Sequence, residues 1–296
     1  MFRTYEDLQS LKIITTQKTH KNLQWVKNFF RYALITVLLV FTVFPVLWAM
    51  LASFKKPMDA ISMTPLFIFK PTLENYSDLF TKTDIPFLKY FMNSMIISLT
   101  SMVISILFAC MAGYSLARIR PRGSRFLTVF ILAVRMLPPI VIIVPLYIFY
   151  NSIGILDTLV GLIIPYTALN IPLATWMMHS FFKGLPKQLE EAAMIDGCGR
   201  IRTFLNVILP LTAPGIAATS IFCFILAWND FLLALPLTSI SAVPLPVIAS
   251  SVRAEEGVLW GKLGAVITIL VIPVFIFTLF VQKHIISGLV SGAVKE

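Results

Sequence analysis

Long apolar runs dominate the chain and are separated by shorter polar stretches. Each run is longer than the roughly 18 residues that indicate a helix crossing about 30 Å of hydrocarbon. A transmembrane β-barrel would instead show short segments of alternating polarity. The pattern therefore predicts an all-α membrane protein with six transmembrane helices, at 32–54, 90–117, 126–150, 159–182, 211–235 and 263–282.

The polar stretches define one membrane domain and two tails. We expect an N-terminal tail over 1–31, a transmembrane domain over 32–285 and a C-terminal tail over 286–296. The first apolar run is too long for the apolar part of a cleaved signal peptide, which has about 7–15 residues. We therefore expect this run to be an uncleaved first span.

Prolines interrupt most of the predicted spans, and the third span holds Pro138, Pro139 and Pro145. Proline removes an amide donor and kinks a helix, and in a membrane the freed carbonyl groups need partners from neighbouring helices or water. Such kinked helices are typical of a bundle that rearranges around a pathway.

The charge of the chain is distributed by side of the membrane. Only 13% of the residues are charged, against roughly a quarter in a soluble domain. Of the 24 Lys and Arg residues, sixteen lie in the N-terminal tail, in the connections at 118–125 and 183–208, or beyond the sixth apolar run, over 283–296. Because Lys and Arg mark cytoplasmic loops, both termini and these connections are predicted to be cytoplasmic. The net charge of +10 is therefore a topology signal and does not indicate a nucleic-acid partner.

A polar, helix-forming segment lies between the fourth and fifth apolar runs, on the predicted cytoplasmic side. Residues 189–195 favour a helix, and Gly197 and Gly199 favour its end. A second helical stretch over 200–209 completes a short helix–turn–helix. Two interpretations fit this composition equally well: a docking element for a soluble protein, or a helix lying on the lipid surface.

This segment resembles the signature loop of the permease subunits of ATP-binding-cassette importers. The signature is Glu-Ala-Ala, three residues, Gly, nine residues, and Ile-x-Leu-Pro. The chain matches it, with valine for isoleucine as the one departure, at Glu191, Ala192, Ala193, Gly197, Val207, Leu209 and Pro210. The resemblance implies a coupling helix within 187–209 that docks on an ATPase, with coupling residues Glu190, Glu191, Ala192, Ala193, Ile195, Asp196, Gly197, Leu209 and Pro210.

The resemblance extends over nearly the whole chain beyond residue 40 and fits the carbohydrate-type branch of these permeases. Supporting stretches include RMLPPIVIIVPLY at 135–147 and AWNDFLLAL at 227–235. It implies the transmembrane fold of type I importers and a multi-pass location in the bacterial inner membrane. The implied cargo is a di- or oligosaccharide such as trehalose or maltose, or a sugar alcohol.

The resemblance also implies partners. These are a second homologous permease subunit, two ATP-binding-cassette ATPase subunits and an extracytoplasmic sugar-binding protein that meets the 236–261 loop, all within membrane lipid. The tail Ser291–Glu296 is expected to reach the ATPase interface. Because the chain has no Gly-x-x-x-x-Gly-Lys-Ser/Thr loop, ATP and Mg²⁺ are expected on the ATPase subunits. The chain itself is expected to be non-catalytic and without a cofactor.

Five polar or aromatic residues within the predicted spans are candidates for a substrate pathway: Arg135, Asn170, Trp228, Asn229 and Asp230. A charged side chain inside the membrane costs at least about 2.5 kcal/mol and should face the bundle interior or a water-filled cavity. Arg135 could contact sugar hydroxyls or tie down carbonyl groups freed by proline. Trp228 could stack on a sugar or anchor the helix at the interface, and Asn170 could line the path or bond a freed carbonyl.

Other classes of function account for fewer features. An ion-driven secondary carrier would need intramembrane acids, and the spans offer only Asp230. An importer of glycerol phosphate would favour several convergent Lys or Arg groups, and the spans offer only Arg135. The three Cys and three His residues show no metal-ligand spacing, and no catalytic cluster is apparent, so neither a metal site nor an enzyme is expected.

Overall fold

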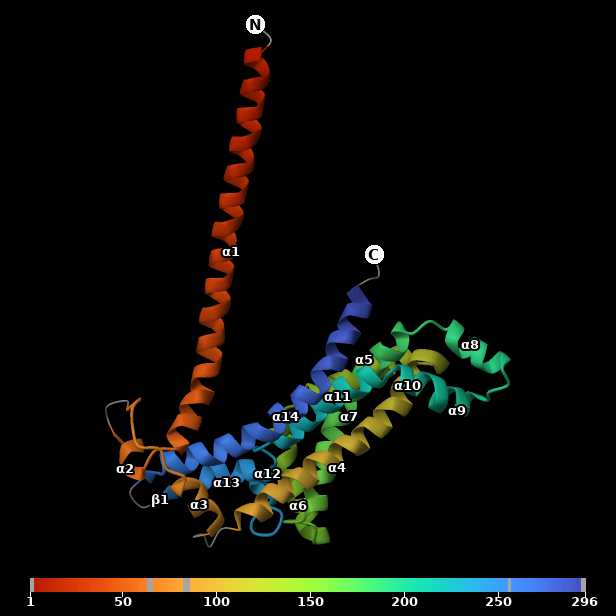
Figure 1. The fold of residues 1–296 in the computed structure, drawn as a ribbon. Coiled ribbons are helices and arrows are strands. Elements are labelled where there is room, and N and C mark those ends of the chain that lie inside the picture. Colours follow the sequence, from red (N-terminus) through yellow and green to blue (C-terminus); the bar gives the residue numbers. More distant parts are fainter. Residues whose placement is uncertain (1–2, 63–65, 82–85, 255–256, 294–296) are drawn as a thin grey trace.

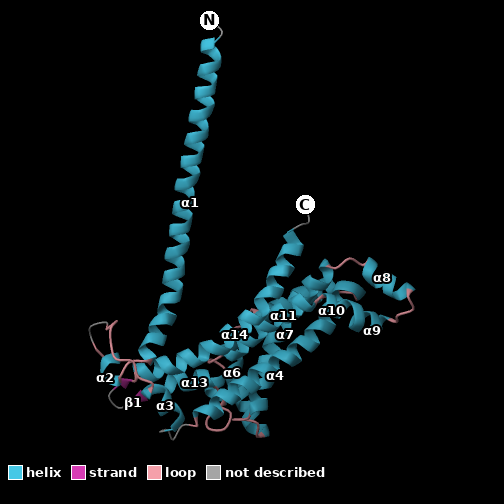
Figure 2. Ribbon diagram, viewed as in Figure 1, coloured by secondary structure: helices cyan, strands magenta, loops and turns pink. Residues whose placement is uncertain are grey.

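The computed structural model describes residues 3–62, 66–81, 86–254 and 257–293, and this part of the chain is almost entirely helical (Figure 2). The longer helices are α1 (Arg3–Ser53), α4 (Phe87–Tyr114), α5 (Ser124–Arg135), α6 (Pro139–Ile153), α7 (Leu159–Gly184), α11 (Ala213–Trp228) and α14 (Trp260–Ala293). The shorter helices are α2 (Pro57–Ala60), α3 (Glu74–Thr81), α8 (Gln188–Ile195), α9 (Arg200–Thr203), α10 (Leu209–Leu211), α12 (Ala234–Leu237) and α13 (Leu245–Ser251). Two π-helical turns, η1 (Ser115–Ile119) and η2 (Phe204–Ile208), and an antiparallel hairpin of β1 (Arg253–Ala254) with β2 (Gly257–Val258) complete the described elements.

Within the described residues, four single helices are long and apolar enough to cross a membrane, and two bent helix pairs raise the number to six. The single spans are Lys27–Ser53, Phe87–Ile119, Leu159–Gly184 and Trp260–Phe280. The predicted number of spans is therefore reached if each bent pair crosses once.

The predicted third span, 126–150, is not one helix. α5 ends at Arg135, α6 begins at Pro139, and the two axes differ by 82°. Pro138 is extended and Pro139 is the first residue of α6, because proline starts a helix readily and disfavours helical conformation in the residue before it. The kink expected from these prolines is therefore a sharp bend between two separate helices.

The predicted fifth span, 211–235, is shorter than its apolar run. α11 ends at Trp228 and is bent by 75° from the helical segment before it. The Asp230 carboxylate then accepts a hydrogen bond from the backbone amide of Leu233 at 3.0 Å and starts the next turn. Asn229 and Asp230 consequently lie just beyond the helix end, whereas the hydropathy pattern placed them inside a span.

Helix α1 runs away from the rest of the bundle and contacts it mainly through α14 (Figure 1). The most hydrophobic window of its span has no buried residue. The two helices meet closely at Gly264, where an added Cβ would lie 2.6 Å from the carbonyl oxygen of Ala49. Over residues 27–47, α1 therefore presents nearly its whole surface to the surroundings.

The centre of the bundle is the packing of α4 against α7 and α11. An added Cβ at Gly113 would lie 2.8 Å from the backbone nitrogen of His179, so α4 and α7 are in backbone contact there. Most of the buried polar residues on these three helices are small: Ser94, Ser98, Ser101, Ser105, Thr167, Thr175 and Thr219. Small and hydroxyl-bearing side chains allow close approach of helices in a membrane.

The segments that connect the long helices lie at the two ends of the bundle. α2, α3, α13 and β1 gather at one end, and α8 and α9 lie at the opposite end (Figure 1). This arrangement fits the charge pattern, because the connections at the α8 end are the basic ones predicted to be cytoplasmic.

Asp157 fixes the loop between α12 and α13 at the outer end. Its carboxylate accepts four backbone N–H bonds, at 2.8–3.1 Å, from the residues 239–242. Its backbone is left-handed, with φ of +55°, and its amide donates to the carbonyl of Leu237 at 3.0 Å. Partial burial alone would raise the pKa of the Asp157 carboxyl, but the four amides together lower it well below its usual value.

We expect this clamp to make stability depend on pH. Because the folded pKa lies below the unfolded value of about 3.9, Asp157 stabilises the fold above that pH, and the contribution is lost as pH falls through the folded pKa. Asp157→Ala should lower the free energy of unfolding at pH 7 by roughly 1–3 kcal/mol and weaken the acid dependence. Thermal melting of the detergent-solubilised protein between pH 7 and pH 3 measures both effects.

Asp157→Asn is the matched control, because asparagine keeps an acceptor oxygen and tolerates left-handed backbone but does not titrate in this range. It should retain part of the neutral-pH stability without the acid loss. An acid loss equal to that of the native protein would assign the pH dependence to other groups.

Candidate functional site

The predicted cytoplasmic helix–turn–helix is formed by α8, α9, η2 and α10. Glu190 and Glu191 occupy the first turn of α8, where acidic side chains favour the helix dipole. Gly197 has φ of +87°, and its amide donates to the carbonyl of Met194 at 3.1 Å. Glycine adopts this backbone conformation without strain, so it ends α8 and turns the chain toward α9.

The exposed surface of this segment combines large apolar side chains with charged ones. Ile195 is 86% exposed and Ile201 is 77% exposed. Glu191, Ala192 and Asp196 are exposed on the same segment. Apolar side chains gathered on a solvent-facing surface are typical of a protein or membrane interaction site.

The other predicted coupling residues do not lie on that surface. Ala193 and Glu190 are both buried, so of the two adjacent alanines only Ala192 offers the small accessible surface expected from the sequence. Leu209 is half-buried and packs against the core cluster around Ile208, and Pro210 is exposed in the first turn of α10.

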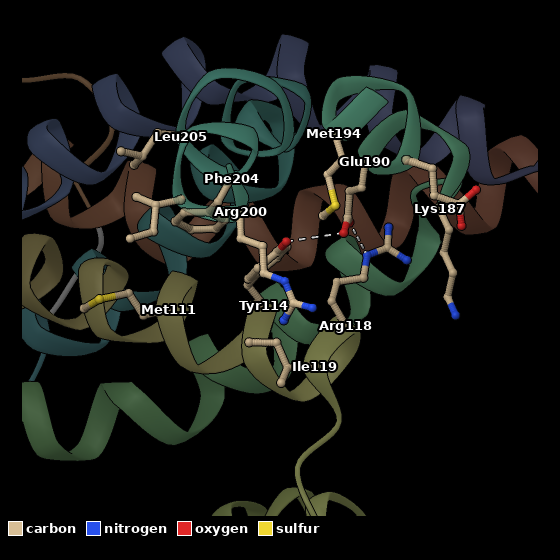
Figure 3. Close-up of a pocket in the computed structure, with 12 residues that line it drawn as sticks. Met111, Tyr114, Arg118, Ile119, Lys187, Glu190, Met194, Arg200, Phe204 and Leu205 are labelled. Carbon is tan, nitrogen blue, oxygen red and sulfur yellow. Dashed lines mark hydrogen bonds and ion pairs between the residues drawn. The ribbon is translucent and has the colours of Figure 1, made fainter. Parts of the chain in front are cut away.

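A cavity of about 700 Å³ lies between this segment and the end of α4 (Figure 3). Figure 3 shows the Glu190 side chain pointing into it, toward Tyr114 and Arg118. The Glu190 Oε1 atom lies 2.6 Å from the Arg118 Nε atom, and Tyr114 donates its hydroxyl to Glu190 Oε2 at 3.3 Å. Sequence reasoning missed both partners, because Tyr114 is 76 residues from Glu190 along the chain.

A second, smaller cavity of about 240 Å³ lies at the bend between α5 and α6, against α7 and α11. It brings together three of the predicted pathway residues, Arg135, Asn170 and Asp230. Arg135 Nη1 donates to the carbonyl of Leu169 at 2.5 Å, and Asn170 Nδ2 donates to the carbonyl of Cys223 at 3.0 Å.

Tyr166 also lines the smaller cavity and was not singled out from the sequence. It donates its hydroxyl to Asp230 Oδ1 at 2.9 Å. The cavity therefore holds a guanidinium, an amide, a phenol and a carboxylate, which are groups that can donate to and accept from sugar hydroxyls. A buried tyrosine in a span needs a hydroxyl partner, but nothing in the local pattern points to a carboxylate 64 residues away.

Trp228 and Asn229 are not among the residues that line this cavity. Trp228 is 1% exposed, and its indole Nε1 donates to the carbonyl of Leu270 at 3.0 Å. Asn229 is exposed at the end of α11. In the structure Trp228 is therefore a core residue between α11 and α14.

We expect Arg135→Ala to reduce uptake about tenfold while changing assembly with partner subunits less than about twofold. One N–H group of the guanidinium donates to the carbonyl of Leu169, and its other N–H groups can donate to a ligand in the cavity. Uptake by membrane vesicles, compared with co-purification of the partner subunits, measures the two effects separately. Assembly that falls in proportion to uptake would assign Arg135 to structure alone.

Comparison with known proteins decides the class of the chain. Residues 105–290 match the family described as binding-protein-dependent transport system inner membrane component. The chain belongs to this family. The matched region contains the cytoplasmic helix–turn–helix and both cavities.

Individual relatives are similar over most of their length. The chain is 38% identical to a probable ABC transporter permease protein, y4oR, of Sinorhizobium fredii, over 95% of this chain and 98% of the relative. It is 36% identical to the trehalose/maltose transport system permease protein MalG of Thermococcus litoralis, over 86% and 92% respectively. It is 35% identical to the sulfoquinovosyl glycerol transport system permease protein SmoH of Agrobacterium fabrum, over 90% and 93%.

The fold is that of a known importer. A crystal structure of a bacterial ABC transporter involved in the import of alginate matches with a TM-score of 0.73 over 88% of this chain and 96% of that chain, at 22% identity. The predicted family, the all-helical type I importer fold and the multi-pass inner-membrane location are thereby confirmed. This permease is a transport subunit of an ABC system.

Proposed function

We propose that this permease is the membrane subunit of an ATP-driven, binding-protein-dependent importer of a sugar. The cargo is a di- or oligosaccharide such as trehalose or maltose, or a sugar alcohol. The observation that carries the proposal is the exposed surface of the cytoplasmic helix–turn–helix, where Ile195 is exposed together with Glu191 and Ala192. A soluble ATPase can bind such a surface, and the short helix can transmit the movement of the ATPase to the transmembrane helices.

The proposed assembly contains a second homologous permease subunit, two ATPase subunits and an extracytoplasmic sugar-binding protein. ATP and Mg²⁺ are bound by the ATPase subunits. The outer loop over 236–261 meets the binding protein, and the Asp157 clamp supports this role because it holds part of the loop in one conformation. Of the tail Ser291–Glu296, residues 294–296 lie outside the described part of the chain.

The chemistry of the smaller cavity favours a neutral polyhydroxylated cargo. Arg135 supplies positive charge and Asp230 supplies an acid, so the lining suits hydroxyl groups better than a phosphate, which would favour several cations. The names of several relatives point the same way, including the trehalose transport system permease protein SugB of Mycobacterium tuberculosis, at 37% identity.

Reconstitution tests this proposal. The complete complex in proteoliposomes, with ATP and Mg²⁺ inside and the binding protein outside, should accumulate radiolabelled trehalose or maltose, and omission of ATP should abolish uptake. Uptake by the isolated chain under a proton or sodium gradient without ATP would make it a secondary carrier. Uptake of glycerol 3-phosphate in preference to the sugars would keep the importer and change the cargo.

A further inference from the structure

Arg118 joins three helices at the cytoplasmic end of the bundle. It lies in η1, the π-helical turn that ends α4. Its Nε atom pairs with Glu190 of α8 at 2.6 Å, and its Nη2 atom donates to the carbonyl of Leu185, at the end of α7, at 2.8 Å. A single guanidinium therefore ties the end of α4 to the end of α7 and to the start of the cytoplasmic segment (Figure 3).

Glu190 is held inside the chain by Arg118 and Tyr114. Its side chain is 11% exposed, that of Arg118 is 7% exposed, and both carboxylate oxygens are engaged, one by Arg118 and one by Tyr114. Glu191 follows directly and is exposed. Glu191 also borders the cavity of about 700 Å³, but it is exposed and stays accessible to a docked protein, whereas Glu190 is held by Arg118 and Tyr114.

The contacts of Arg118 and Glu190 continue into a packed cluster of aromatic rings around Tyr114. The ring of Tyr114 packs against Phe182 of α7, with centroids 5.7 Å apart, and against Phe204 of η2, with centroids 4.7 Å apart. Just before Tyr114 in the chain, Gly113 brings α4 into backbone contact with α7. A displacement of α8 is therefore passed to α4 and α7 together, through the ion pair between Arg118 and Glu190 and the hydrogen bond from Arg118 to Leu185.

We propose that Glu190 and Arg118 are positioning residues that transmit the movement of the cytoplasmic segment to α4 and α7. The inference rests on the proposed function, because the movement would come from an ATPase docked on the exposed face. Glu191 is exposed to the docked ATPase, whereas Glu190 is buried against Arg118. Two adjacent residues of like charge then have separable effects, one on ATPase binding and one on coupling.

The test compares Glu190→Ala with Glu191→Ala in the complete transporter. Co-purification of the ATPase reports docking, and ATP hydrolysed per sugar transported reports coupling, with radiolabelled trehalose, maltose and sorbitol as probes. Glu190→Ala should keep ATPase association within about twofold and raise the ATP cost per sugar about tenfold. Glu191→Ala should lower ATPase association and leave that ratio near native in the complexes that remain.

Two further variants keep the test decisive if Glu190→Ala accumulates poorly. Arg118→Ala should give the same uncoupling, and the double variant should be no worse than either single one, because both remove one contact. Glu190→Gln should restore part of the coupling, since its amide oxygen can accept from Tyr114 or Arg118 although the charge of the ion pair is lost.

Loss of ATPase association with Glu190→Ala, to the extent seen with Glu191→Ala, would overturn the proposal, and so would an unchanged ATP cost per sugar. Multiplying effects in the double variant would also overturn it. A native chain that retains no ATPase would instead defeat the proposed function itself, so the two failures are distinguishable.

Discussion

Gly197→Asp is expected to abolish ATP-driven uptake and to reduce ATPase co-purification at least about tenfold, with the bundle still inserted in the membrane. Gly197 has φ of +87°, a conformation that side chains other than glycine occupy at a cost of order 1–2 kcal/mol. No atom lies within 4 Å of an added Cβ, so the fold can accommodate the side chain. The defect therefore arises from a distorted turn and an added charge on the exposed face.

Gly199→Asp is the matched control. Gly199 also has open space around an added Cβ, but its φ is −67° and it caps α9, where aspartate is favoured. It should retain most of its ATPase association. Normal uptake and undiminished ATPase association with Gly197→Asp would contradict a docking role for this turn.

Trp228→Ala is expected to destabilise the permease by about 3–5 kcal/mol and to lower both its melting temperature and its yield. The indole stacks on Phe224 with centroids 5.5 Å apart, meets Phe91 edge-on at 5.8 Å, and donates to the carbonyl of Leu270. Its removal leaves a large void between α11 and α14 and breaks the hydrogen bond to Leu270.

Trp176→Ala provides the comparison, because Trp176 lies on α7 and is 43% exposed. It should cost less than about 1 kcal/mol. Thermal melting in detergent measures both variants. A Trp228→Ala protein with native stability and a raised KM for sugar would show that Trp228 contacts the substrate.

Hydropathy and charge predicted the spans and the cytoplasmic segment because both depend on local properties of the chain. The length of each apolar run matches the thickness of the hydrocarbon layer. The glycine at position 197 indicates the turn that ends α8. The bend of 82° at Pro138 and Pro139 could be suspected from the prolines, but its angle depends on the packing of α5 and α6 against other helices.

The different positions of Glu190 and Glu191, one buried and one exposed, could not be predicted from the sequence. Glu190 and Glu191 are chemically identical, and only the rotation of α8 against α4 sends one inward and the other outward. Tyr166 and Asp230 meet because α7 packs beside α11, which no local pattern records. Contacts between residues far apart in the chain are therefore what the structure adds.

The central claim is that an ATPase docks on the exposed face of the cytoplasmic segment. The most direct test is a pull-down from detergent-solubilised membranes expressing the complete transporter, comparing the native chain with Glu191→Lys. The account predicts that an ATPase and a second permease subunit co-purify with the native chain, and that the charge reversal removes the ATPase while the second permease remains. A native chain that purifies alone and still moves solute without ATP would contradict it.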